Sequence, residues 1–218
     1  MFRLVNYEYH GWNLPDDTVV KAMKLKELNN LASIIDYFYL EKSKLENKTG
    51  YCSKGIHNFD FAHYIKTEIA EVKFVYLMRD PRDVTASWLK TPLHLHTPFK
   101  IVKQWNEQQA VCRRFQACYP KDVVSLRYED LIENTEVEMM RAQEELGLDV
   151  DERCFTTNKE NQEAKSNEFW KNLNKLIIKG NASKFLKTLS YGDINIVESV
   201  ARENMLAYGY TNFHAKGD

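Results

Sequence analysis

The sequence lacks the long apolar runs, paired cysteines and charge excess that mark several classes of protein. No apolar stretch approaches the ~18 residues that a membrane-spanning helix needs. The four cysteines, at positions 52, 112, 118 and 154, form no CxxC pair, so we expect no metal site built on them. Because 30 Lys and Arg balance 31 Asp and Glu, the net charge of −1 argues against nucleic acid as a partner.

Targeting signals are also lacking. The opening residues MFRLVNYEYHGWN contain no apolar segment of the kind found in signal peptides. Scattered thiols without an export signal favour a reducing compartment, so we expect a cytoplasmic protein. The length of 218 residues and a hydrophobic content of 44% predict one folded domain over residues 1–218.

Strands and helices alternate along most of the chain. Val72–Met78 is nearly all apolar, as in a strand that is buried on both faces of a parallel sheet. Asp122–Arg127 is a second predicted strand. Predicted helices flank the strands at Phe99–Tyr119, at Thr135–Leu146 before Gly147, and at Asp193–Tyr208 before Gly209. This pattern predicts an α/β fold, with a parallel β-sheet flanked by helices.

The first third of the chain gives weaker signals. We expect a helix after Asp16-Asp17, with apolar positions running from Val19 to Ile35. A short strand is predicted at Tyr51–His57 and a short helix at Phe59–Ile69.

The stretch RDPRDVTAS, which begins at Arg79, follows the first apolar strand directly. Pro81 suits the first helical position, so Asp80 is the expected N-cap and Asp83 the third helical residue. Arg79 and Ser87 can both donate hydrogen bonds to phosphate oxygens, which predicts an anion site. The alternative is a charged turn in which Arg79 pairs with an aspartate.

Three further groups of candidate site residues lie near the ends of predicted strands or in a late loop. Tyr128 in RYEDL is placed to stack on a base, or is a half-buried tyrosine. Lys179-Gly180 in KGNASKF is suited to wrapping a phosphate, or is a solvated turn. His57 ends a predicted strand and is either a general base or a structural histidine.

Together these segments resemble the PAPS-dependent sulfotransferases, over roughly residues 50–210. RDPRDVTAS resembles the family's 3′-phosphate-binding segment, RYEDL its next strand end, and KGNASKF its late loop R-K-G-x-x-G-D-W. The resemblance implies a P-loop NTPase-like fold and PAPS or PAP as cofactor, with no metal.

The resemblance also implies roles for individual residues. Arg79, Ser87 and Lys179-Gly180 would hold the 3′-phosphate, and Tyr128 would lie by the adenine. His57 would take the proton from a hydroxyl or amine of a small-molecule or glycan acceptor.

The sequence departs from the family's pattern in two places. The family's opening loop P-[KR]-S-G-[ST]-T, which grips the 5′-phosphosulfate, does not occur in the 218 residues, and MFRLVN resembles the helix that follows it. We therefore expect an N-terminally truncated relative. In the late loop, Ser183, Lys184 and Phe185 stand where the family has Gly, Asp and Trp.

Other functions stay open at this point. One is a catalytically inactive nucleotide-binding or interaction module of the same fold. A small-molecule kinase would need G-x-x-x-x-G-K-[ST], which the sequence does not contain. A metal hydrolase would rest on His94 and His96 alone, which is a weak pattern. The sequence does not identify the acceptor.

Overall fold

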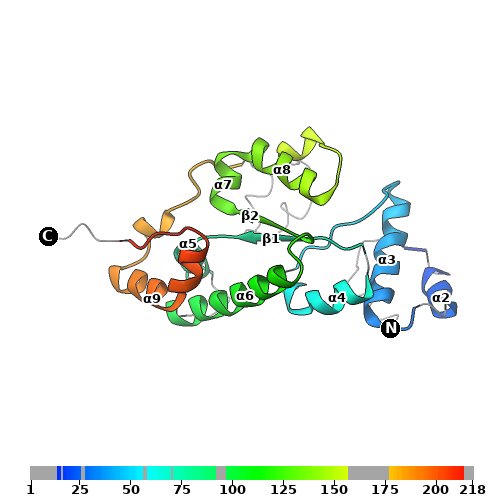
Figure 1. Cartoon of the computed structure of the whole chain (residues 1–218), viewed down its shortest axis with the longest axis horizontal. Helices are drawn as coiled ribbons and strands as arrows, with labels where there is room; N and C mark the ends of the chain where they lie inside the picture. The colour runs from blue at the N-terminus through cyan, green and yellow to red at the C-terminus, as the bar shows by residue number, and fades with distance from the viewer. Residues whose placement is uncertain are drawn as a thin grey trace. The chain divides into compact units, whose positions relative to one another are not determined.

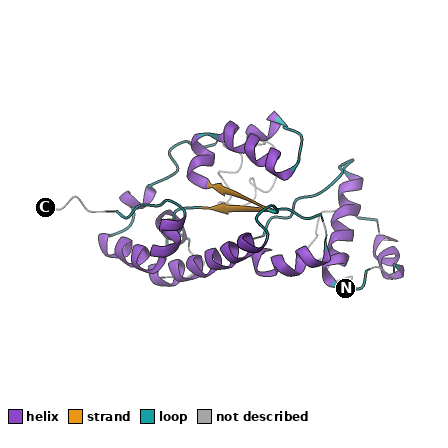
Figure 2. Cartoon of the chain, in the orientation of Figure 1, coloured by secondary structure: helices purple, strands orange, loops and turns teal. Residues whose placement is uncertain are grey.

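The computed structural model describes residues 14–15, 17–25, 28–55, 58–69, 71–91, 97–156 and 177–213. The chain divides into two compact units, Met1–Val72 and Lys73–Asp218. Helices make up most of the described structure in both units, and the two described strands lie in the second (Figure 2). No helix in the described ranges is long and apolar enough to cross a membrane. The single domain expected over residues 1–218 stays a prediction.

The first unit contains α2 (Asp17–Lys24), α3 (Leu31–Leu45), the 3-10 helix η1 (Asn58–Phe61) and α4 (Ala62–Glu68). The helix predicted after Asp16-Asp17 is therefore present as α2, but its continuation to Ile35 is wrong, because a second helix, α3, begins at Leu31 with Asn30 as its N-cap. The Asn30 side chain accepts the Ser33 N–H at 2.8 Å, and the Ser33 hydroxyl caps the Asn30 backbone in return. This capping box breaks an otherwise continuous apolar pattern.

The strand predicted at Tyr51–His57 is also wrong where it can be examined, since residues 51–55 have no regular structure. Tyr51 instead stacks on Tyr39 of α3, with ring centroids 4.6 Å apart. Its hydroxyl donates to Asp36 at 2.6 Å. These contacts hold the segment against a helix rather than in a sheet. The short helix predicted at Phe59–Ile69 is confirmed as η1 and α4.

The second unit carries the predicted parallel sheet (Figure 1). Its elements are β1 (Phe74–Met78), α5 (Pro81–Trp88), α6 (Pro98–Cys118), β2 (Val123–Arg127), α7 (Tyr128–Glu133), α8 (Thr135–Leu146), the 3-10 helices η2 (Glu152–Phe155) and η5 (Lys184–Lys187), and α9 (Tyr191–Ala207). β1 and β2 pair in parallel from Phe74 opposite Val123 to Met78 opposite Arg127. The predicted α/β fold with flanking helices is confirmed.

Local capping signals account for the helix ends. Asp80 caps α5 by accepting the Arg82 N–H at 2.8 Å, as predicted. α8 ends at Gly147, whose φ of +74° is a left-handed conformation that favours glycine. α9 begins at a capping box between Ser190 and Asp193.

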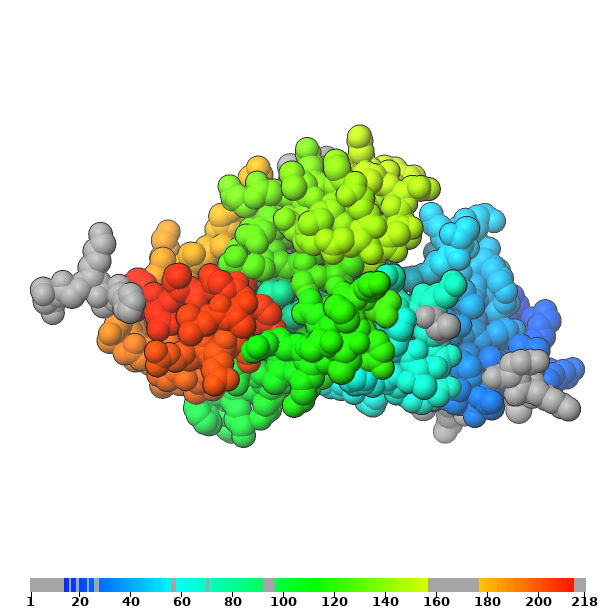
Figure 3. Space-filling view, in the orientation of Figure 1, coloured from blue at the N-terminus to red at the C-terminus, as the bar shows by residue number. Residues whose placement is uncertain are grey.

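The two faces of the sheet pack against different helices. On one face, Phe74 meets Phe115 of α6 edge-on, with ring centroids 4.7 Å apart. Behind it, α6 and α9 share a core, and their side chains lie directly against each other in Figure 3. The buried residues of this core are Val102, Trp105, Val197, Ala201, Met205 and Tyr210. On the other face, α8 covers Val124 and Leu126.

β1 is buried on one face only, which corrects the expectation of burial on both. Val75 and Leu77 are 44% and 52% exposed, whereas Phe74, Tyr76 and Met78 are buried. The reason is that α8 packs over β2, where it covers the neighbours of these two residues in the register. A continuous apolar run cannot reveal which of two adjacent strands a helix covers.

A buried ion-pair network fixes the start of α5. The Arg82 guanidinium forms a two-pronged pair with Asp80, at 3.0 and 2.6 Å, and a bond of 2.6 Å to Glu198 of α9. It also donates to the Thr211 carbonyl at 3.0 Å and lies 4.3 Å from the Phe185 ring centroid. Burial lowers the pKa of Arg82, but Asp80 and Glu198 outweigh this effect and leave the pKa raised.

We expect Arg82→Ala to lower the free energy of unfolding by about 3–5 kcal/mol, because two buried carboxylates lose their partner. Urea unfolding followed by circular dichroism measures this loss. Arg153→Ala is a matched control, since Arg153 forms the same two-pronged pair with an aspartate two residues earlier, but on the surface. Equal losses in the two variants would contradict a special role for burial.

Candidate functional site

Arg79 and Tyr128 lie together at the carboxyl edge of the sheet. Each follows directly after the last residue of its strand, and Met78 and Arg127 are paired in the register. The Arg79 guanidinium carbon lies 4.4 Å from the centroid of the Tyr128 ring, a cation–π contact. The predicted meeting of these two side chains at one edge is therefore observed.

The late loop reaches the same place through Asn181. Lys179 and Gly180 form a turn closed by a hydrogen bond of 3.2 Å from the Asn181 N–H to the Ile178 carbonyl. Gly180, at φ +74°, has the left-handed conformation that such a turn requires. The Asn181 carbonyl then accepts from Arg79 Nη2 at 3.1 Å, and the Asn181 amide donates to the Tyr128 hydroxyl.

Asp83 lies behind Arg79 and holds the late loop in place. Its side chain is fully buried, and its Oδ1 accepts the backbone N–H of Phe185 at 2.9 Å. Its Oδ2 lies 3.9 Å from Arg79 Nη2 and has no hydrogen-bond donor among the described residues. Arg79 Nε is also buried, without an acceptor in the same ranges. The alternative in which Arg79 pairs with an aspartate is thus partly right. Arg79 does face Asp83, but the distance of 3.9 Å is long for an ion pair.

Glu129 connects the segments that follow the two strands through hydrogen bonds. One of its carboxylate oxygens accepts the Asp80 N–H at 2.9 Å, and the other accepts the Tyr210 hydroxyl at 2.8 Å. Burial, with Glu129 nearby, raises the pKa of Tyr210 and keeps this hydroxyl protonated as a donor. The contact links the RDPRD and RYEDL segments directly.

The structure says less about the other predicted site residues. Ser87 lies in the last turn of α5 with an exposed side chain, and its hydroxyl makes no hydrogen bond within the described part of the chain. Lys179 is exposed beside Gly180. His57 lies outside the described residues, as do His94 and His96.

Sequence reasoning missed three residues that hold this site: Asn181, Glu129 and, in its tethering role, Asp83. Asp83 was predicted only as the third helical residue, which it also is. A carboxylate directly after Tyr128 was the only local signal for Glu129. Nothing in the sequence distinguishes Asn181 from its loop neighbours, because its contacts lie 53 and 102 positions away.

The arrangement suits an anion that is attached to a flat aromatic group. Arg79 offers a charged donor, the turn at Lys179-Gly180 adds a second cation, and Tyr128 supplies a ring. In the described ranges no cluster of three His, Cys, Asp or Glu side chains has the spacing of a metal site.

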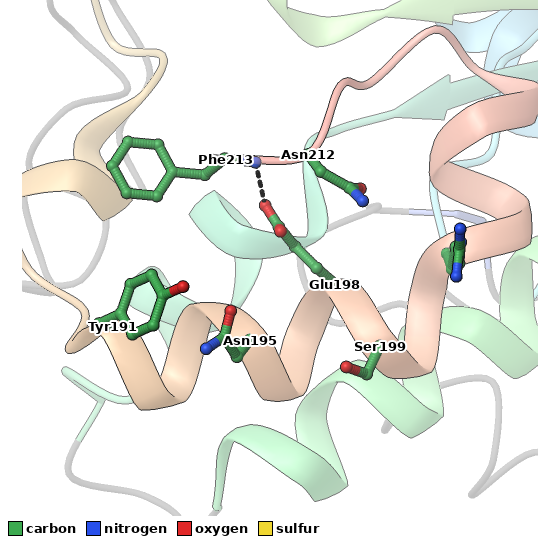
Figure 4. A pocket seen from close by; sticks show the side chains of 7 residues that line it. Tyr191, Asn195, Glu198, Ser199, Asn212 and Phe213 are labelled. Atoms are coloured by element: carbon green, nitrogen blue, oxygen red, sulfur yellow. Dashed lines mark hydrogen bonds between the residues drawn. The ribbon is translucent and has the colours of Figure 1, made fainter. Parts of the chain in front are cut away.

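A separate polar pocket of about 280 Å³ lies along α9 (Figure 4). It is lined by Tyr191, Asn195, Glu198, Ser199, Arg202, Asn212 and Phe213. None of these is a predicted site residue, and Glu198 is already bonded to Arg82 and to the Phe213 N–H. The carboxyl edge of the sheet therefore remains the stronger candidate.

We expect Asp83→Ala to speed hydrogen exchange at the Phe185 amide by about ten- to a hundredfold, because that amide loses its buried acceptor. Asp83→Asn keeps an oxygen acceptor and should preserve slow exchange. The Asp193 amide, bonded to Ser190 Oγ at 3.1 Å, is the internal control. Unchanged Phe185 exchange in Asp83→Ala would show that the loop is held by other contacts.

Comparison with known proteins identifies a family. A family model described as "Sulfotransferase family" matches residues 3–152, well over half of the chain. The matched range includes Arg79, Ser87 and Tyr128, and ends before Lys179 and Gly180. No curated protein matches the sequence. On the strength of the family match, the chain belongs to the sulfotransferase family.

Proposed function

We propose that the chain uses 3′-phosphoadenosine 5′-phosphosulfate (PAPS) as its sulfuryl donor, and that the site at Arg79 and Tyr128 binds its 3′-phosphate and adenine. The acceptor would be a hydroxyl or amine of a small molecule or glycan. The observation that carries the proposal is the stack of Arg79 on Tyr128 beside the late loop.

The unused hydrogen-bonding capacity of Arg79 supports a phosphate ligand. Within the described ranges the guanidinium donates one hydrogen bond, to the Asn181 carbonyl, and the side chain is 25% exposed. A phosphate oxygen at the exposed part of the guanidinium would add a charge-assisted bond. A neutral ligand would leave the guanidinium charge without a new counter-charge.

Each residue has a distinct part in the proposal. Arg79, with Ser87 and the Lys179-Gly180 turn, would hold the 3′-phosphate, while Tyr128 would lie against the adenine. PAPS supplies an activated sulfuryl group. His57 would act as general base, accepting the proton of the acceptor's hydroxyl or amine through a ring nitrogen. No metal takes part in this scheme.

A second function follows from one sequence observation. The 218 residues contain no segment of the type P-[KR]-S-G-[ST]-T, which would supply backbone N–H groups for the 5′-phosphosulfate. A catalytically inactive nucleotide-binding or interaction module of the same fold would bind the nucleotide without transferring sulfuryl. Nucleotide binding and group transfer are therefore tested separately.

Calorimetric titration with PAP, the desulfated product, tests binding, with AMP as the control that lacks the 3′-phosphate. We expect PAP to bind more tightly than AMP. Arg79→Ala should weaken PAP binding by about 2–4 kcal/mol, roughly 30-fold to several hundredfold, because charge-assisted bonds are lost.

Arg114→Ala is the matched control, since it removes the same charge from an exposed position on α6. Its neighbour Phe115 contacts Phe74 at the opposite, amino end of β1. Equal affinity for PAP and AMP, or equal effects of the two arginine variants, would overturn the proposed nucleotide site. Transfer of label from PAPS to a panel of acceptors would then separate an enzyme from a binding module.

A further inference from the structure

Asn181 contacts both principal residues of the proposed site from a single position. Its backbone carbonyl accepts from Arg79 Nη2 at 3.1 Å, and its side-chain amide donates to the Tyr128 hydroxyl. The two contacts come from opposite ends of the residue, so Asn181 closes a ring with the Arg79–Tyr128 stack. Among the described residues, no other is hydrogen-bonded to both Arg79 and Tyr128.

The ring restricts the freedom of two side chains. An arginine has a long flexible side chain, and a tyrosine can swing about its χ1 and χ2 angles. Asn181 fixes the far end of each, at the guanidinium and at the hydroxyl. Because ordering these groups would otherwise oppose binding, prior ordering strengthens the binding of a ligand that touches both.

Asn181 is itself held in position. The turn bond from its N–H to the Ile178 carbonyl sets the backbone on one side. On the other side, the Phe185 N–H is tied to the buried carboxylate of Asp83 at 2.9 Å. The loop is therefore anchored at both ends of the short stretch from Ile178 to Phe185.

The carbonyl of Asn181 also takes up one of the donors of Arg79. It occupies Nη2, whereas Nε is buried without an acceptor among the described residues. A phosphate would then approach the exposed part of the Arg79 side chain, which is 25% exposed, and not the buried Nε.

We propose that Asn181 is a positioning residue, which holds Arg79 and Tyr128 in one preformed arrangement and so sets the preference for a 3′-phosphorylated nucleotide. This inference rests on the proposed nucleotide site. It adds a residue that lies outside the RDPRDVTAS and RYEDL segments, and it assigns a purpose to the amide side chain.

A double-mutant cycle between Asn181→Ala and Tyr128→Phe tests the inference, with PAP and AMP titrated against each variant. Asn181→Ala removes the amide but keeps the backbone carbonyl, and Tyr128→Phe removes only the hydroxyl. We expect each to weaken PAP binding by about three- to tenfold, and the double variant to be no weaker than either single variant. AMP binding should change less, because AMP lacks the phosphate that Arg79 would hold.

Asn181→Asp separates positioning from simple packing. Its carboxylate can still accept a bond from the Tyr128 hydroxyl, but it places a negative charge beside the proposed phosphate. PAP binding should therefore fall below that of Asn181→Ala. Asn195→Ala, an exposed asparagine on α9 that lines the separate pocket, is the matched control and should bind PAP as the unmodified chain does. Thermal unfolding checks that every variant is folded.

The possible results distinguish a failure of the positioning role of Asn181 from a failure of the proposed nucleotide site. If the unmodified chain prefers PAP to AMP, but Asn181→Ala binds PAP normally or adds independently to Tyr128→Phe, the positioning role is overturned and the nucleotide site stands. If the unmodified chain does not distinguish PAP from AMP, the proposed function fails and takes this inference with it. Non-additive losses that are specific to PAP support both.

Discussion

The ion pair of Arg82 with Asp80 and Glu198 is the interaction on which the second unit depends. It joins the junction of β1 and α5 to α9, and its further bond to the Thr211 carbonyl holds the segment after α9. Three buried charges are stable only when their hydrogen bonds are nearly complete. Here the guanidinium donates to both carboxylates and to one carbonyl, so the helix start is fixed in a single position.

The position of Arg79 follows from that anchoring. In RDPRD, Asp80 and Arg82 are bonded to each other, and Asp83 is bonded to the late loop. Arg79 lies at the sheet edge, where its Nη2 donates to the Asn181 carbonyl. Two aspartates and one arginine thus shape the backbone, and the other arginine is the one proposed to bind a ligand. The sequence alone does not distinguish the roles of these four charged residues. Only their burial in the structure does.

Most of the elements that were predicted from sequence are those with strong local signals. α8 ends at a left-handed Gly147, and α5 begins with Asp80 and Pro81, so neighbouring residues suffice to place these ends. Two of the failures depend on contacts beyond neighbouring residues. Tyr51 packs on α3 instead of entering a sheet, and Val75 is exposed because α8 lies over the adjacent strand.

The same division holds for the site. Arg79 and Tyr128 were predicted to meet because parallel strands bring their carboxyl ends to one edge, which is a rule of topology. Asn181 and the tethering role of Asp83 could not be predicted, since the bond from Arg79 to Asn181 and the bond from Phe185 to Asp83 each join residues 102 positions apart. No periodicity or capping rule operates over that separation.

The charges around the proposed site bear on how it would achieve affinity in a chain with a net charge close to zero. The chain as a whole carries a net charge of −1, and Arg79 has the buried Asp83 carboxylate 3.9 Å away. That carboxylate offsets part of the attraction that a bare arginine would exert on any anion. In the proposed function, selectivity would therefore come from the order of the site, in which a guanidinium is fixed against a ring. A ligand that combines a phosphate with a planar base meets both features at once, whereas a free anion meets only the first.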